Sequence, residues 1–192
     1  MNYSMLHNGV APDGNMDFFG IIKWLLWILI IFVIVQNYWE LQIGKIYVFT
    51  YHRYKTRGIW ILQHTAVMLG ICIIYSLVLM GVNALITDAD ITTLLKGALL
   101  FGIFIFNMNY MFCTVREIKS SVKISLWVVL FGVSTVLCSV VNSRQYWNIS
   151  SYGMLAQQMW ESEYLVSLMA NLIVTGALIV GKVLLSKRRI NK

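Results

Sequence analysis

Long apolar stretches alternate with short polar segments along this chain. Five of these stretches reach the roughly 20 residues that an α-helix needs to cross a lipid bilayer. They lie near residues 18–38, 61–82, 94–112, 122–141 and 165–185. The pattern therefore predicts an all-α, polytopic membrane protein, with a single transmembrane domain over residues 1–192 and about five membrane-spanning helices.

The segment 41–58, between the first two apolar stretches, is too polar at its end to cross a membrane. Its apolar and aromatic positions fit a short helix at the membrane interface, and they are Ile43, Ile46, Tyr47, Phe49, Tyr51 and Tyr54. The segment ends in a basic cluster of Arg53, Lys55 and Arg57. Two interpretations stay open: a basic loop that only orients the protein, or a cytoplasmic helix that docks into another protein.

The composition also indicates a membrane protein. Apolar residues make up 59% of the 192 residues and charged residues 12%, whereas soluble domains have about 25% charged residues. The net charge of +7 would suit nucleic acid, but the basic residues lie between the apolar stretches, which is typical of an oriented membrane protein. We therefore expect the lipid bilayer, and no nucleic acid, as a partner.

The basic residues predict the orientation as well. Twelve of the 15 fall on one side of the predicted spans, and basic loops stay in the cytoplasm. These twelve are Lys45, Arg53, Lys55, Arg57, Arg116, Lys119, Lys123, Lys182, Lys187, Arg188, Arg189 and Lys192. The N-terminus is then outside, the C-terminus and the segment 41–58 are cytoplasmic, and the loop 142–164 is external. Residues 1–17 lack the basic start of a signal peptide, so we expect the first span to be retained.

The chain shows no pattern typical of a catalytic or metal site. The predicted spans contain no Asp or Glu, and His64 is their one histidine, so general acid–base chemistry has no obvious donor. We expect His64 to be a packing or interfacial residue. A Gly-x-x-x-x-Gly-Lys-Ser/Thr loop is also absent, so ATP would not be bound here by that route. The sequence thus predicts a protein that is not an enzyme and holds no cofactor or metal itself.

The polar residues inside the predicted spans include asparagines, which carry no charge. Asn107, Asn109 and Asn171 can hydrogen-bond between helices, and the alternative is that they line a substrate pathway. Small residues at four-residue spacing occur as Ala98 with Gly102 and as Ala177 with Gly181. Such pairs permit close contact between helices.

From the first span onward, the chain is similar to the permeases of ABC-2 type exporters. The resemblance lies in an apolar span, an aromatic run, the string Arg-Tyr-Lys-Thr-Arg-Gly-Ile-Trp at 53–60, a long second span and a basic tail after Gly181. The small bacteriocin- and lantibiotic-associated permeases of Gram-positive bacteria resemble it most. Those proteins usually have six spans with both termini inside, so the resemblance implies that a counterpart of their first span is missing from the five spans expected here.

The resemblance implies that the basic segment is a coupling helix, which sits in a groove of a cytoplasmic ATPase. Carried over by position, the contact residues are Tyr51, Arg53, Tyr54, Lys55, Thr56, Arg57 and Trp60. It further implies a partner ATPase subunit that binds ATP and Mg²⁺, and a second permease subunit, identical or related.

We therefore expect a permease subunit of an ATP-driven exporter in the bacterial cell membrane, moving a peptide or another amphipathic substrate. The alternative is a non-transporting membrane partner, such as a bacteriocin immunity protein or an assembly scaffold. An independent ion-coupled carrier is disfavoured because such a carrier normally needs a buried carboxylate.

Overall fold

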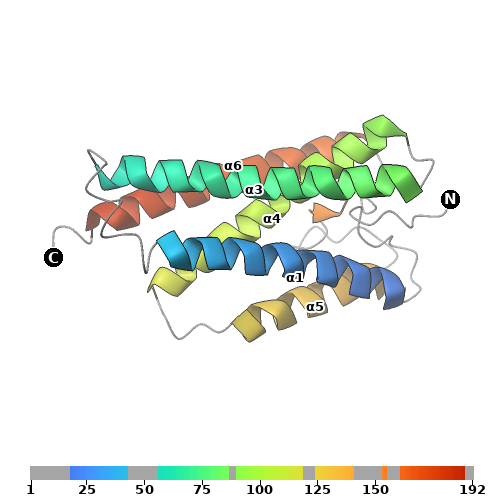
Figure 1. Cartoon of the computed structure of the whole chain (residues 1–192), viewed down its shortest axis with the longest axis horizontal. Helices are drawn as coiled ribbons and strands as arrows, with labels where there is room; N and C mark the ends of the chain where they lie inside the picture. Colours follow the sequence, from blue (N-terminus) through green and yellow to red (C-terminus); the bar gives the residue numbers. More distant parts are fainter. Residues whose placement is uncertain are drawn as a thin grey trace.

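The computed structural model describes residues 18–42, 56–86, 90–118, 124–140, 153–154 and 161–188. Within these ranges the chain forms α-helices and no strand (Figure 1). The helices are α1 (Phe18–Glu40), α3 (Arg57–Ile86), α4 (Ile91–Ile118), α5 (Ile124–Val140) and α6 (Glu161–Arg188). The single proline of the chain, Pro12, precedes them all, so no helix contains this helix-breaking residue. The predicted all-α class is confirmed for the described part of the chain.

Four of the helices are long and apolar enough to cross a membrane by length and composition. Their candidate spans are Ile21–Glu40, Gly58–Val82, Ile91–Glu117 and Glu163–Leu184. The predicted span 122–141 coincides with α5, which has 17 described residues. The fifth crossing and the orientation of the chain stay predictions, and so does the cytoplasmic helix, because residues 43–55 lie outside the described part.

Helix α4 is the centre of the bundle. In Figure 1, α3 and α6 lie together, α1 and α5 lie together, and α4 runs obliquely between the two groups. It packs against α1, α3 and α6. Accordingly 67% of its candidate span is buried, against 17% of the span in α6. Large apolar side chains such as Leu85 and Ile173 point outward, as expected of helices whose outer surface meets lipid.

Aromatic rings fill much of the contact between α1 and α4. Trp24 lies 4.7 Å from Phe101, and Phe32 lies 4.9 Å from Phe112, measured between ring centroids. Helix α3 approaches α4 through a small residue, because a Cβ on Gly102 would lie 3.4 Å from the Cβ of Ser76. Of the pair Ala98 and Gly102, which permits a close contact between helices, Gly102 lies at such a contact in the structure. Gly181, from the second predicted pair, has open space around it within the described structure.

The helix ends that flank the predicted cytoplasmic segments all lie at one end of the bundle (Figure 1). Successive helices run in opposite directions, so α1, α4 and α6 end where α3 and α5 begin (Figure 1). We call this the basic end, and it holds Glu40, Arg57, Ile118 and Arg188. The segment 43–55 connects α1 to α3 at this end.

Candidate functional site

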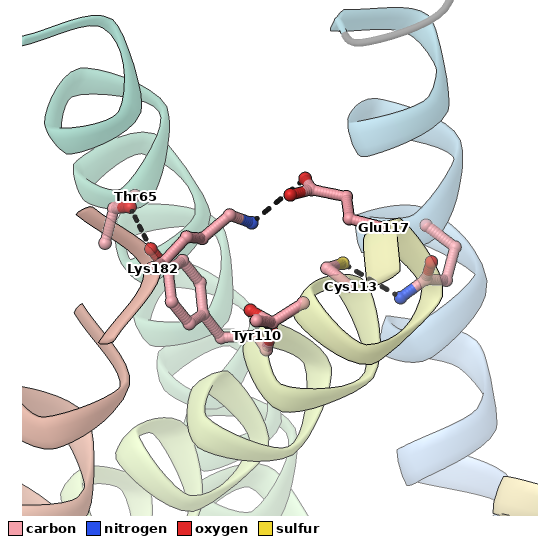
Figure 2. A network of polar contacts seen from close by, with 7 residues as sticks. Thr65, Tyr110, Cys113, Glu117 and Lys182 are labelled. Carbon is pink, nitrogen blue, oxygen red and sulfur yellow. Dashed lines mark hydrogen bonds and ion pairs between the residues drawn. The ribbon is translucent and has the colours of Figure 1, made fainter. Parts of the chain in front are cut away.

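An ion pair lies inside the bundle at the basic end (Figure 2). Lys182 of α6 places its Nζ 3.3 Å from Oε1 of Glu117 on α4. The lysine side chain is 3% exposed and the glutamate side chain 28%. Removing an ammonium from water is costly unless a well-placed partner offsets that cost. A buried lysine near the end of an apolar helix is therefore a feature that needs a specific partner, and Glu117 provides it.

Two aromatic rings complete the surroundings of this ammonium. Nζ of Lys182 lies 3.6 Å from the ring centroid of Trp39 and 4.7 Å from that of Tyr110. Cation–π contacts of a desolvated ammonium contribute about 2 kcal/mol or more. We call Trp39, Tyr110 and Glu117 the ammonium cage. Because Trp39 is on α1, the cage joins α1, α4 and α6 through one charge.

Helix α3 contacts the ammonium cage through Tyr110. The hydroxyl of Thr65, on α3, donates a hydrogen bond of 2.9 Å to the Tyr110 hydroxyl (Figure 2). The Tyr110 ring also stacks on Phe106 at 5.3 Å and meets the edge of Trp39 at 6.5 Å. The tyrosine is fully buried, so these contacts hold its ring in place beside Lys182.

A cysteine lies one helical turn before Glu117. Gln36 Nε2 on α1 donates a hydrogen bond of 3.3 Å to Sγ of Cys113 on α4. Cys113 is fully buried. The Gln36 Oε1 atom is buried and has no hydrogen-bond partner among the described residues. The thiol therefore lies in the same α1–α4 contact as the cage, shielded from water.

A second ion pair lies toward the surface of the basic end. Arg116 on α4 pairs with Glu40 at the end of α1. Their side chains are 36% and 52% exposed, and exposed pairs contribute about 0–1 kcal/mol. This pair adds little to stability and serves as a natural comparison for the buried pair.

The helices on the two sides of the segment 43–55 are joined to each other. The Tyr38 hydroxyl of α1 lies 2.6 Å from Nδ1 of His64 on α3. The edge of the Trp60 ring meets His64 at 4.6 Å between centroids. Thr56 caps α3, because its hydroxyl accepts a hydrogen bond of 3.4 Å from the Ile59 N–H. His64 thus has a specific polar partner in addition to the packing role expected for it.

The predicted docking residues fall partly within this region. Tyr51, Arg53, Tyr54 and Lys55 lie outside the described residues. Arg57 is the first residue of α3, and Thr56 just before it is exposed. Trp60 is 3% exposed, so its ring packs inside the bundle. The docking role of these residues, Trp60 included, stays a prediction.

The three predicted pathway asparagines are separated into two kinds of contact. Asn107 on α4 donates from Nδ2 to the backbone oxygen of Asn171 on α6 at 2.9 Å. The Thr175 hydroxyl donates to Oδ1 of Asn107 at 2.7 Å. Asn109 instead donates to the Ile105 carbonyl of its own helix. Asn107 and Asn171 are thus brought together as an interhelical contact, whereas a role in a pathway stays a prediction.

Sequence reasoning missed the pair of Lys182 and Glu117. Lys182 falls within the predicted span 165–185, where it counts only as one of the basic residues of the cytoplasmic side, and Glu117 lies beyond the predicted span 94–112. Helix α4 continues to Ile118, and α6 continues to Arg188, so both residues lie on helices that pack together. One signal was present, because Lys182 is followed by Val183, Leu184 and Leu185. A charge with apolar residues on both sides indicates an intramembrane ionisable group.

Among the described residues, no group of three or more His, Cys, Asp or Glu side chains is placed to hold a metal ion. No protein-family model, curated protein or solved structure matches this chain.

Proposed function

We propose that this chain is the membrane subunit of an ATP-driven exporter, in which the segment 41–58 docks onto a separate cytoplasmic ATPase. The proposal draws on the sequence resemblance of residues 53–60 to coupling segments. Its main structural support is the contact between Tyr38 and His64, which joins the helices on both sides of that segment. A force applied to the segment would reach α1 and α3 together.

The contacts of the basic end extend that connection to the rest of the bundle. From α3, Thr65 contacts Tyr110 of α4, and Tyr110 contacts Lys182 of α6. A displacement at the segment 41–58 is thus transmitted to α4 and α6 through buried polar contacts. Coupling of this kind requires contiguous elements that have two arrangements.

In this proposal the phosphate chemistry resides on the partner. The ATPase subunit binds ATP and Mg²⁺, and the membrane chain supplies helices that change arrangement. A second membrane subunit, identical or related, would line the pathway together with this one. The substrate would be a peptide or another amphipathic molecule, in keeping with the resemblance to bacteriocin-associated permeases.

Purification of the tagged full-length chain from its native membranes tests the proposal. We expect an ATPase with a phosphate-binding loop to co-purify, identified by mass spectrometry. The triple variant Arg53→Glu, Lys55→Glu, Arg57→Glu should lose that ATPase. A matched control, Lys187→Glu, Arg188→Glu, Arg189→Glu, changes the same charge in the tail and should retain it.

Two outcomes contradict the proposal. One is a complex that survives the triple change in the basic segment while the variant is correctly inserted. The other is the absence of any ATPase from the purified material, which would favour the non-transporting immunity or scaffold alternative.

A further inference from the structure

We propose that Lys182 and Glu117 form a latch, which holds α6 against α4 and α1 at the basic end and opens when the end of α6 moves away. The latch is the ion pair itself together with the two rings of the ammonium cage. The opening of the latch during transport rests on the proposed exporter function, whereas the ion pair and its contacts with the two rings do not.

The choice of charged residues is the first argument. Apolar side chains would hold helices together without any cost of desolvation, and replacing both members of a buried pair by apolar groups is often neutral or stabilising. Removing one member is instead strongly destabilising, because the other is left buried and charged. A charge pair thus makes the closed arrangement depend on both partners. Lys182 and Glu117 suit a contact that must be able to break.

The position of the pair is the second argument. Lys182 lies two residues before the end of the candidate span, at Leu184, and Glu117 is already partly exposed. A lysine has a long flexible stem that reaches water from the last turn of a membrane helix. A small outward movement of this end of α6 would therefore hydrate both charges, so the open arrangement avoids a buried, unpaired ion.

A second contact between α4 and α6 supplies a fixed point for that movement. Asn107 accepts a hydrogen bond from the Thr175 hydroxyl and donates one to the backbone oxygen of Asn171, both on α6. Thr175 is two turns before Lys182, or about 10 Å along the helix at 1.5 Å per residue. The deeper contact can persist while the end of α6 swings away from Trp39 and Glu117.

Cys113 provides a reporter for the latch. Its thiol is buried beside Gln36, one turn from Glu117. The experiment uses the full-length protein in liposomes, with Cys72→Ala and Cys138→Ala, and measures the rate at which N-ethylmaleimide labels Cys113. We expect slow labelling in this parent. Lys182→Met and Glu117→Gln should each raise the rate by more than about tenfold. Glu117→Gln leaves the buried Lys182 ammonium without its ionic partner, and Lys182→Met leaves the partly exposed Glu117 carboxylate unpaired and removes the contacts of the ammonium with Trp39 and Tyr110.

The double variant separates a latch from a simple packing contact. Lys182→Met with Glu117→Gln removes both charges, so we expect the labelling rate to return to within about threefold of the parent. The single changes alter the local charge in opposite directions, so an electrostatic effect on the thiolate cannot accelerate labelling in both. Arg116→Gln breaks the exposed pair with Glu40 and should change the rate by less than about threefold.

The latch is overturned if either single variant, correctly inserted, labels as slowly as the parent. It is also overturned if the double variant labels as fast as the single ones. Glu117→Gln preserves shape at a partly exposed position, so it decides the test if Lys182→Met fails to insert.

A last measurement tests whether the latch opens during ATP-driven transport. With the co-purified ATPase and ATP, the parent should label faster than with the ATPase alone. An unchanged rate would overturn the role in export while leaving the single-variant result, and hence the latch, intact.

Discussion

The hydroxyl of Tyr38 lies 2.6 Å from Nδ1 of His64, and this contact joins α1 to α3 near the end of α1 and the beginning of α3. The same two helices have a second polar contact farther from the basic end, in which the Tyr75 hydroxyl donates to the Trp27 carbonyl at 2.9 Å. The two tyrosines differ in their distance from the segment that we propose to be the docking site. This difference allows stability and docking to be tested separately.

Tyr38→Phe and Tyr75→Phe are expected to have similar effects on stability and different effects on docking. Each removes one hydroxyl hydrogen bond, at a cost of about 1 kcal/mol, which a thermal melt of the purified protein in detergent would detect. We expect Tyr38→Phe alone to weaken co-purification of the ATPase. Equal weakening by Tyr75→Phe would indicate that the contact beside the segment has no special role.

Gly102 tests the close contact between α3 and α4. A Leu side chain at this position would meet Ser76 and the Cys72 carbonyl oxygen, which lies 3.6 Å from a Cβ built on the glycine. Gly102→Leu should therefore destabilise the protein by about 1–3 kcal/mol. The control is Gly70→Leu on α3, where a Cβ meets nothing within 4 Å among the described atoms. A melting temperature that falls equally for both would contradict this account of the contact.

The hydroxyl of Thr175 tests the polar contact between α4 and α6. Thr175→Val keeps the shape of the side chain and removes the hydrogen bond to Asn107. We expect a loss of about 0.6 kcal/mol, which is typical of such contacts between membrane helices. Thr114→Val is the matched control, because the Thr114 hydroxyl bonds the Tyr110 carbonyl of its own helix. A larger loss for Thr114→Val in chemical denaturation would argue against an interhelical role for Thr175.

The predicted orientation is open to direct labelling. With the native cysteines replaced, a cysteine introduced at position 10 should react with a membrane-impermeant maleimide from outside the cell. A cysteine at position 55 should react only after the membrane is permeabilised, since basic segments remain in the cytoplasm. Labelling of position 10 solely after permeabilisation would overturn an N-terminus on the outer side.

The positions of the helices were largely predictable from the sequence. Membrane helices form wherever a long apolar stretch must satisfy its backbone polar groups internally, and that condition depends on neighbouring residues of the chain. The predicted spans accordingly fall on α1, α3, α4, α5 and α6. The ends were less predictable, because α4 continues past the predicted end at 112 to Ile118 and so includes Glu117.

The inward faces of the helices were not predictable. Lipid is as apolar as the interior of a membrane protein, so an all-apolar helix does not indicate which face meets its neighbours. Trp39, Tyr110 and Lys182 belong to three helices and meet because α4 crosses obliquely between the others (Figure 1). A charge count could only assign Lys182 to the basic side of the membrane.

The sequence by itself thus predicted the all-helical class, about five apolar spans and a basic segment between the first two, and four helices of the structure are long and apolar enough to cross a membrane. These follow from local apolar length and charge. The tertiary structure decided that Lys182 turns inward to Glu117, that Asn107 meets Asn171, and that Trp60 is buried. Those contacts depend on helix crossing and on side-chain direction, which bring together residues far apart in the chain.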